Sequence, residues 1–308
     1  MVHSFFSIII TALNPGRRLL PTLNSVLEQT FPDYEVILKD GGSTDGSLCR
    51  KSDGTWAVAG DDGSALQDGR IRILRQKDRG IYDGMNQALP LIRGKYVLFL
   101  NCGDRLYDRN VLSRIAGAIR ERMGGAPERD TAFGDKTAAA RQEEYPLRIW
   151  YGDQFNELQK SHVHSSPRLD DFACYRNVPC HQVCFYDARL FSERGYDTDY
   201  RVRADYEHFL WSLYEKKAEA VYLPVTVAAY EGGGFSETRE NRRRSALEHR
   251  VITRFYMGRM KSACFRFIML ATLAPLRTWA AENPKLAKGY NALKSLLYKR
   301  MSGKKEKS

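Results

Sequence analysis

The sequence predicts an α/β fold with a mainly parallel central sheet and helices on both of its faces. Short runs rich in Val, Ile and Leu alternate, in the first half of the chain, with segments whose apolar residues recur at helical spacing. Each apolar run ends in a turn-forming stretch of Gly, Asp or Asn. At 308 residues, 43% of them hydrophobic and 28% charged, the chain can bury a large core.

The expected elements alternate between strand and helix. In order they are strand 5–13, helix 17–30, strand 34–39, strand 70–75, helix 80–92 and strand 95–100. Residues 51–69, rich in Gly, Asp and Ser, are expected to form a surface insertion. Because helices connect the strands, the sheet should be parallel and covered on both faces. The alternation of strand-like and helix-like segments becomes irregular from about residue 105 and is regular again after about residue 176.

Charge is distributed unevenly along the chain. The formal net charge is +11, yet residues 239–308 alone hold 18 Lys/Arg and 4 Asp/Glu. The rest of the chain is slightly acidic, which excludes a protein that coats nucleic acid uniformly. Residues 285–301 form an amphipathic pattern with Leu286, Tyr290 and Leu293 on one face and lysines around it. Such a helix lies in a membrane interface or packs on its own domain with a solvated basic face.

The six cysteines show no disulfide framework and no paired zinc-ligand spacing. Cys174, Cys180, Cys184 and His181 lie close together in sequence, but at irregular intervals, so buried apolar thiols are expected rather than zinc. Reduced thiols favour the cytosol. The N-terminal apolar run has no basic region before it and is expected to be a buried strand rather than a signal peptide.

Three polar motifs follow predicted strands: "TALN", "DGGSTDGS" and "LNCGD". In parallel α/β sheets ligands bind beyond the carboxyl ends of the strands, so the three motifs should meet in one cleft. The carboxylate of Asp40 can accept the imino N–H of uracil or guanine, beside glycines that permit close approach. Asp104 suits Mg²⁺ or Mn²⁺. Taken singly, Asp40 could belong to an ordinary turn, and Asp104 could cap the following helix.

These motifs resemble the start of a family 2 glycosyltransferase of the GT-A fold. The segments are "FSIIITALNPGRRLLPTLNSVLEQTF", "YEVILKDGGSTDGS" and "DRGIYDGMNQALPLIRGKYVLFLNCGD". They are most similar to colanic-acid-type bacterial polysaccharide transferases, which read "DRGIYDAMN…LNSGD". The resemblance is strong over residues 5–110 and thinner to about residue 236. It implies a catalytic domain at 1–238, with a nucleotide-binding half at 1–110 and an acceptor-binding half at 111–238. A basic helical tail at 239–308 would follow.

The resemblance also implies roles for individual residues on the donor side. Thr11 and Asn14 would line the nucleoside pocket, and Asp40 would hold the base. Nucleoside or donor-sugar contacts would come from Arg79, Asp83 and Asn86. Asp104 would hold the metal, Mg²⁺ or Mn²⁺, that bridges the diphosphate. Many members of the family read "DADD" where this chain has Asn101-Cys102-Gly103-Asp104, so a single carboxylate remains in the motif.

The inverting transfer that the resemblance implies also requires a general base. Asp205, in "YRVRADYEHFLW", stands where similar enzymes carry their catalytic aspartate, and Glu207 is the second choice. The alternative for Asp205 is a helix N-cap. His181 is expected on the acceptor side or as a structural histidine. Gly233, in "EGGGFS", belongs to a loop over the site or to a simple turn.

The predicted function is therefore inverting transfer of a sugar from a nucleotide diphosphate, with a UDP-sugar favoured. The acceptor would be a hydroxyl of a lipid-linked surface polysaccharide at the cytoplasmic face of the membrane, where the basic tail binds. Two alternatives stay open at this stage. One is a sugar nucleotidyltransferase, although "TALNPGRRLL" has only one glycine for a triphosphate loop. The other is a non-catalytic, nucleotide-sugar-binding membrane partner, which the reduced metal motif suggests.

Overall fold

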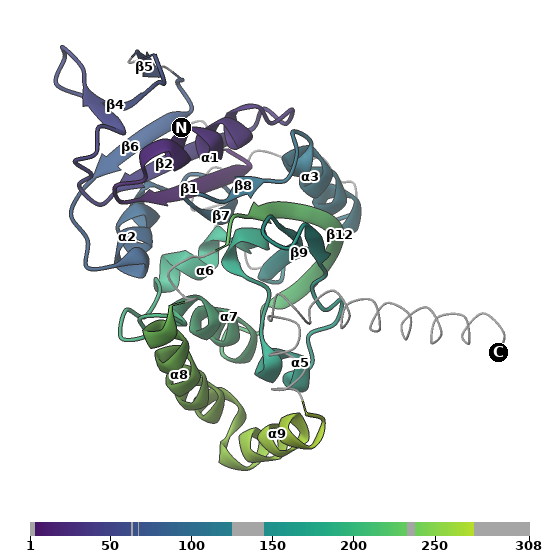
Figure 1. The fold of residues 1–308 in the computed structure, drawn as a ribbon. Coiled ribbons are helices and arrows are strands. Elements are labelled where there is room, and N and C mark those ends of the chain that lie inside the picture. Colours follow the sequence, from purple (N-terminus) through teal and green to yellow (C-terminus); the bar gives the residue numbers. More distant parts are fainter. Residues whose placement is uncertain (1–3, 63, 67, 125–144, 233–237, 274–308) are drawn as a thin grey trace. The chain divides into compact units, whose positions relative to one another are not determined.

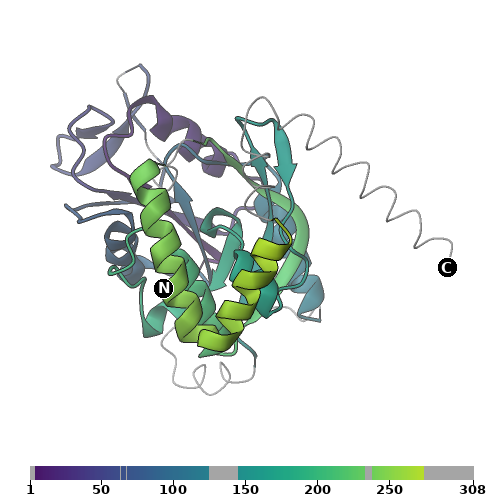
Figure 2. The same cartoon turned by 60° about the horizontal axis from the view of Figure 1, so that its bottom comes forward.

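The computed structural model describes residues 4–62, 64–66, 68–124, 145–232 and 238–273 (Figure 1). The chain divides into two compact units, Met1–Ile252 and Thr253–Ser308. Helix α8 (Arg239–Met257) spans this division and appears as one long green helix in Figure 2, and α9 (Arg259–Ala271) follows it. The boundary expected at residue 238 stays a prediction. Within the described ranges, no helix is both long enough and apolar enough to cross a bilayer.

The first unit is built on a nine-stranded sheet in the order β6-β2-β1-β7-β11-β9-β12-β8, with β10 paired to β9. Its strands are β1 (Phe6–Ala12), β2 (Tyr34–Asp40), β6 (Ile71–Arg75), β7 (Tyr96–Asn101), β8 (Arg105–Leu106), β9 (Arg148–Asn156), β10 (Ser161–Val163), β11 (Cys184–Asp187) and β12 (Glu219–Tyr230). Strands β6, β2, β1 and β7 pair in parallel, as the sequence predicts.

The second half of the sheet is mixed rather than mainly parallel. Strand β11 runs antiparallel to both β7 and β9, and β8 and β10 are also antiparallel to their neighbours. Strands β12 and β9 form a further parallel pair. The expected parallel arrangement describes the first half of the sheet, and the second half adds antiparallel strands, because apolar patterning predicts a strand but not its direction. Short connections decide the direction: residues 157–160 are too few for a crossover, so β10 must fold back on β9.

The segment expected as a surface insertion forms a small antiparallel sheet of its own. Its strands are β3 (Leu48–Arg50), β4 (Trp56–Ala59) and β5 (Ala65–Leu66). The guanidinium of Arg75, at the end of β6, lies 4.0 Å from the centre of the Trp56 ring. This cation–π contact connects the small sheet to the edge of the main one.

Helices cover the sheet, and its central strands are buried along nearly their whole length. Burial on both faces explains why β1, β2 and β7 read as continuous apolar runs. The α-helices of this unit are α1 (Leu19–Leu27), α2 (Ile81–Ala88), α3 (Val111–Arg122), α5 (Asp171–Arg176), α6 (Ala188–Glu193) and α7 (Ala204–Tyr214). Short 3₁₀ turns are η1 (Gly16–Arg18), η2 (Leu89–Leu91) and η3 (His181–Val183).

A buried ion pair fixes the loop that leads into α2. The Lys39 ammonium, at the end of β2, is fully buried and lies 2.8 Å from Asp78 Oδ2. It also donates a hydrogen bond to the backbone oxygen of Gln76. A buried ammonium requires partners of this kind, so residues 76–78 are held close to the sheet edge. The loop that carries Arg79 is thereby positioned beside the carboxyl ends of the parallel strands.

Candidate active site

A cavity of about 1330 Å³ opens at the carboxyl ends of β1 and β7. Six of the residues predicted from the sequence line it: Thr11, Arg79, Asp83, Asp104, His181 and Asp205. Because β11 runs antiparallel to β7, the start of β11 lies at the edge where β7 ends. The turn η3, which precedes β11, is therefore brought beside the "LNCGD" motif. The mixed half of the sheet thus completes a site that the parallel half begins.

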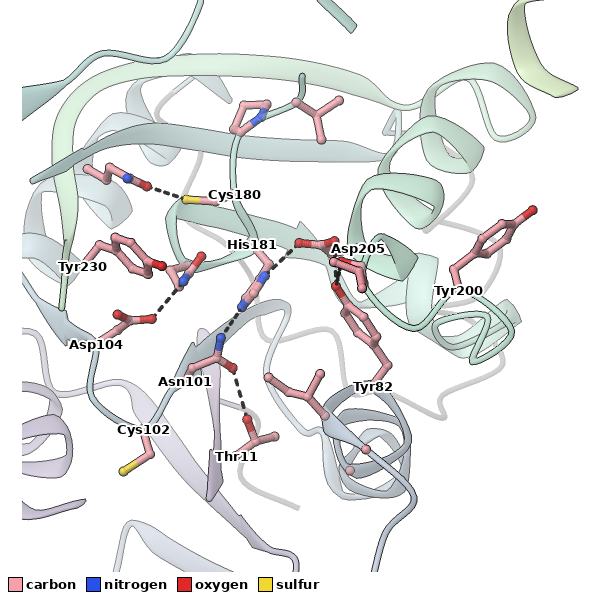
Figure 3. Close-up of a pocket in the computed structure, with 18 of the residues that line it drawn as sticks. Thr11, Tyr82, Asn101, Cys102, Asp104, Cys180, His181, Tyr200, Asp205 and Tyr230 are labelled. Carbon is pink, nitrogen blue, oxygen red and sulfur yellow. Dashed lines mark hydrogen bonds and ion pairs between the residues drawn. The ribbon is translucent and has the colours of Figure 1, made fainter. Parts of the chain in front are cut away.

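A chain of hydrogen bonds crosses this cavity (Figure 3). Thr11 Oγ1 donates to Asn101 Oδ1 at 3.2 Å, and Asn101 Nδ2 lies 2.9 Å from His181 Nε2. His181 Nδ1 lies 2.9 Å from Asp205 Oδ2, and the Tyr82 hydroxyl donates to Asp205 Oδ1 at 2.8 Å. Since an amide nitrogen only donates, His181 Nε2 accepts and Nδ1 carries the proton that it gives to Asp205.

Asp205 lies in the first turn of α7, but it does not cap that helix, since the N-cap position is Arg203. Burial alone would raise the pKa of the Asp205 carboxyl. The hydrogen bond from His181 and its electrostatic attraction, together with the hydrogen bond from Tyr82, outweigh burial and lower that pKa. The carboxylate is therefore ionised at neutral pH. Its Oδ1 also accepts from the backbone N–H of Tyr206, whereas Oδ2 has one partner among the described residues and keeps a lone pair for another donor.

Asp104 is held on the other side of η3. Its Oδ2 accepts a hydrogen bond of 2.8 Å from Gln182 Nε2, and its Oδ1 accepts one of 3.1 Å from the backbone N–H of Glu231. The residue is 4% exposed, and burial raises the pKa of its carboxyl despite these bonds. It caps no helix, since the N-cap of α3 is Asn110. His181 and Gln182 are consecutive, so one turn contacts both carboxylates.

The oxygen atoms around Asp104 suit a hard divalent cation. Gln182 Oε1 is buried and has no hydrogen-bond partner among the described residues. A carboxylate with a nearby unpaired amide oxygen fits Mg²⁺ or Mn²⁺, which take oxygen ligands and keep positions for phosphate or water. The cysteine cluster does not form a metal site: in the described parts of the chain, no group of three or more His, Cys, Asp or Glu is arranged to bind one. All six cysteines are free thiols.

Four predicted residues do not line the cavity. Asp40 is 1% exposed, and its carboxylate accepts from the backbone N–H groups of Gly42 and Ser43 and from the Ser43 hydroxyl. Asn14 accepts through Oδ1 from the backbone N–H of Thr44 at 2.8 Å. These contacts organise the loops after β1 and β2, and the predicted contacts with the nucleoside stay predictions.

The other two residues outside the cavity also have structural partners. Asn86 exchanges two hydrogen bonds of 2.8 Å with the backbone of Tyr196. Glu207 is buried in an ion pair with Arg194. Within the cavity, Asp83 Oδ2 accepts from the backbone N–H of Arg79 and fixes the start of α2. Gly233 lies outside the described residues.

Sequence reasoning missed three residues of the site. Tyr82 and Glu231 stand inside the motifs "DRGIYDGMN" and "EGGGFS", and Gln182 directly follows the candidate His181. Their contacts connect positions far apart in the chain, as the separation of 123 positions from Tyr82 to Asp205 illustrates. Motif membership was therefore the available signal, and only the fold shows what each side chain touches.

Comparison with known proteins identifies the family. The family described as "Glycosyl transferase family 2" matches residues 7–182. A PGL/p-HBAD biosynthesis glycosyltransferase of Mycobacterium tuberculosis is 34% identical over 240 residues, which cover 77% of this chain and 81% of that protein.

Two solved structures share the fold at low sequence identity. S. aureus TarS 1–349 in complex with UDP has a TM-score of 0.52 at 14% identity, covering 82% of this chain and 64% of that one. The mannosyltransferase PcManGT from Pyrobaculum calidifontis, in complex with GDP-Man and Mn²⁺, has a TM-score of 0.52 at 14% identity. The match covers 94% of this chain and 84% of the PcManGT chain. The predicted GT-A fold is confirmed, and the chain belongs to glycosyl transferase family 2 and is a glycosyltransferase.

Proposed function

We propose that this enzyme transfers a sugar, with inversion, from a nucleotide diphosphate donor to a hydroxyl of a growing surface polysaccharide or glycolipid. The observation that carries the proposal is that two carboxylates, the buried Asp104 and the partly buried Asp205, line one cavity. Inverting transfer needs a base on the side of the attacking hydroxyl and charge stabilisation on the side of the leaving group. Asp205 suits the first role and Asp104 the second.

In the proposed reaction the acceptor hydroxyl donates a hydrogen bond to Asp205 Oδ2. As its oxygen forms a bond to the anomeric carbon, the bond from that carbon to the diphosphate breaks and the proton passes to Asp205. His181 Nδ1–H holds the carboxylate in place, and Asn101 holds the imidazole through Nε2. General base catalysis of this kind contributes about 10²- to 10⁴-fold in rate.

Asp104 and the amide oxygen of Gln182 would hold Mg²⁺ or Mn²⁺. When bound, such a cation neutralises charge that develops on the departing diphosphate. The Mn²⁺ in the PcManGT complex supports this assignment. The guanidinium groups of Arg18 and Arg79 also line the cavity, and arginine matches the geometry of phosphate oxygens.

A UDP-sugar is the favoured donor, and a GDP-sugar is the alternative. The UDP complex of TarS supports the first choice and the GDP-Man complex of PcManGT the second. Thermal unfolding with a panel of UDP- and GDP-sugars, with and without Mn²⁺, separates them. The true donor at 100 times its dissociation constant should stabilise the protein by about 2.7 kcal/mol.

The proposed base is tested on the same donor. The Asp205→Asn variant should lose about 10²- to 10⁴-fold in turnover and keep the donor-dependent thermal shift. Unchanged turnover in this variant would exclude Asp205 as the base. A panel in which no nucleotide sugar stabilises the wild type would contradict the donor class itself.

The proposed acceptor is lipid-linked, so the enzyme would act at the cytoplasmic face of the membrane as a peripheral protein. Helix α8 supports this placement. Leu247, Val251 and Phe255 recur every four residues and are 61%, 56% and 74% exposed, which puts them on one helical face. Exposed arginines flank them on the same helix. An apolar stripe with a basic border is typical of helices that bind anionic lipid surfaces. Residues 285–301, which carry the predicted amphipathic helix, lie outside the described residues.

A further inference from the structure

Gly103 lies where the metal motif of many family members has a carboxylate, and the space beside it is occupied by another acidic residue. A Cβ atom on Gly103 would lie 2.3 Å from Oε2 of Glu231. The backbone φ of Gly103 is +111°, a conformation that side-chain-bearing residues rarely adopt. The glycine thus removes one carboxylate from the motif and gives room to that of Glu231.

The backbone also holds Glu231 against the motif. Its N–H donates a hydrogen bond of 3.1 Å to Asp104 Oδ1, so the end of β12 is tied to the carboxylate that is the predicted metal ligand. The Glu231 side chain is about half exposed and lines the cavity. Its Oε2 lies 3.7 Å from Nη1 of Arg18.

A further observation points to a cation rather than to a chance cluster of acids. Gln182 is 7% exposed, its Nε2 donates to Asp104, and it lines the same cavity. Its Oε1 finds no hydrogen-bond partner in the part of the chain that the structure describes. A buried amide oxygen without a donor favours a positively charged ligand beside it.

We propose that Glu231 supplies the second carboxylate of the divalent-cation site, in the space that Gly103 leaves. Asp104, Gln182 and Glu231 then offer oxygens from three separate segments, and diphosphate oxygens and water complete the shell. The inference rests on the proposed metal-dependent transfer and assigns to it a ligand from outside the four-residue motif. Arg18 lies beside Glu231, and a cation bound to Glu231 would leave this guanidinium to contact the diphosphate.

The competing explanation is that Glu231 only positions Arg18. The two explanations differ in what removal of Arg18 does to the affinity for the cation. If Glu231 is a ligand, Arg18→Gln removes a competing positive charge, and the affinity for Mn²⁺ is kept or increases. If Glu231 acts through Arg18, both Arg18→Gln and Glu231→Gln weaken Mn²⁺ binding equally.

The test is a titration with Mn²⁺ in the presence of UDP, with bound metal counted from the loss of the free-ion electron paramagnetic resonance signal. Glu231→Gln keeps the shape of the side chain and should weaken Mn²⁺ binding by about 10-fold or more. Glu231→Asp, which withdraws the carboxylate by one methylene, should weaken it less. Glu157→Gln is the matched control, because Glu157 forms ion pairs at the neighbouring strand end, outside the cavity lining. The affinity of Glu157→Gln for Mn²⁺ should equal that of the wild type.

The outcomes separate this inference from the proposed function. If Asp104→Asn abolishes Mn²⁺ binding while Glu231→Gln and Glu231→Asp bind as the wild type does, the Glu231 assignment is wrong and the metal site of Asp104 stands. Equal weakening by Arg18→Gln and Glu231→Gln also overturns it. If the wild type binds no Mn²⁺ with UDP present, both the metal dependence and the inference fail.

Discussion

At the scale of single residues, the chemistry of Asp205 is set by what its two oxygens touch. Oδ1 accepts from Tyr82 and from a backbone N–H, and Oδ2 accepts from His181. Without these donors, the partial burial of the Asp205 carboxyl would favour its neutral form. The donors thus keep the group ionised, although they also make it a weaker base. His181 is the largest of the contributions that lower the pKa.

Loss of His181 should therefore shift the pH dependence of catalysis. The His181→Phe variant loses the hydrogen bond that lowers the pKa of Asp205, whereas burial continues to raise it. The pKa of Asp205 should therefore be higher in this variant than in the wild type. Because the proposed base must be ionised, activity should be lost at a higher pH on acidification than in the wild type. The acid limb of kcat/KM against pH measures this shift.

Two controls distinguish this effect from general damage to the site. His181→Asn, whose amide can donate in place of Nδ1–H, should move the acid limb back toward that of the wild type. His162→Phe, outside the cavity lining, should leave it unchanged. An acid limb that does not move in His181→Phe would mean that Asp205 does not control it.

At the scale of elements, the wall of the cavity depends on how β9 and β12 pair. Their register shifts twice between Tyr222 and Ala228, which marks a bulge in β12. Gly152 lies opposite, and a Cβ on it would be 2.3 Å from the backbone oxygen of Val225. Backbone cannot yield as a flexible side chain does, so the glycine is required for this close approach.

Substitution of Gly152 should accordingly destabilise the fold. Gly152→Ala forces the two strands apart and should cost about 1–3 kcal/mol of unfolding free energy, as overpacking generally does. Gly117→Ala, within α3 and with open space around the new Cβ, should instead stabilise by up to about 1 kcal/mol. Denaturant midpoints of the two variants and the wild type give both values. If Gly152→Ala is as stable as the wild type, the strands are free to separate at this point.

At the scale of the whole molecule, positive charge is concentrated in residues 239–308 while the remainder is slightly acidic. Such segregation favours an oriented approach to an anionic surface, with the acidic part of the chain repelled. Attraction of this kind weakens as salt rises, because counter-ions screen it over a Debye length of about 8 Å at physiological ionic strength.

The protein should therefore bind vesicles that contain anionic lipid and not neutral ones. Serine at Leu247, Val251 and Phe255 together should weaken binding, because burial of the apolar stripe is lost. Leu158→Ser, which removes a single exposed leucine from the β9–β10 turn, should have no effect. Flotation with vesicles at low and high salt measures the binding of the wild type, the triple serine variant and Leu158→Ser. Equal binding of the wild type to neutral and anionic vesicles would contradict the proposed surface.

The sequence was sufficient for the parallel half of the sheet and for the edge at which the site forms. Short continuous apolar runs between turn signals, such as β2 and β7, are typical of strands buried on both faces, and the carboxyl ends of parallel strands lie at one edge of the sheet. The direction of β11 could not be predicted, since it depends on pairing with strands distant in sequence. For the same reason the partners of Asp205 could not be predicted: Tyr82 and His181 reach it only through tertiary packing.

Asp40 and Asn86 show a further limit of prediction from motifs. Both stand in recognised motifs, yet in the structure each satisfies backbone groups of nearby or distant loops. A polar residue at a strand end can serve the loop or the ligand, and the sequence pattern is the same in both cases.

Because His181 and Gln182 are neighbours in the chain, one short turn contacts Asp205 through the first residue and Asp104 through the second. A shift of this turn would therefore disturb the proposed base and the proposed metal ligand at the same time. The cavity is also lined by Ser165–Ser166 and Thr198–Asp199, which belong to other segments of the chain. Substitutions intended to alter which substrate the enzyme uses are best placed in those segments and not in the turn.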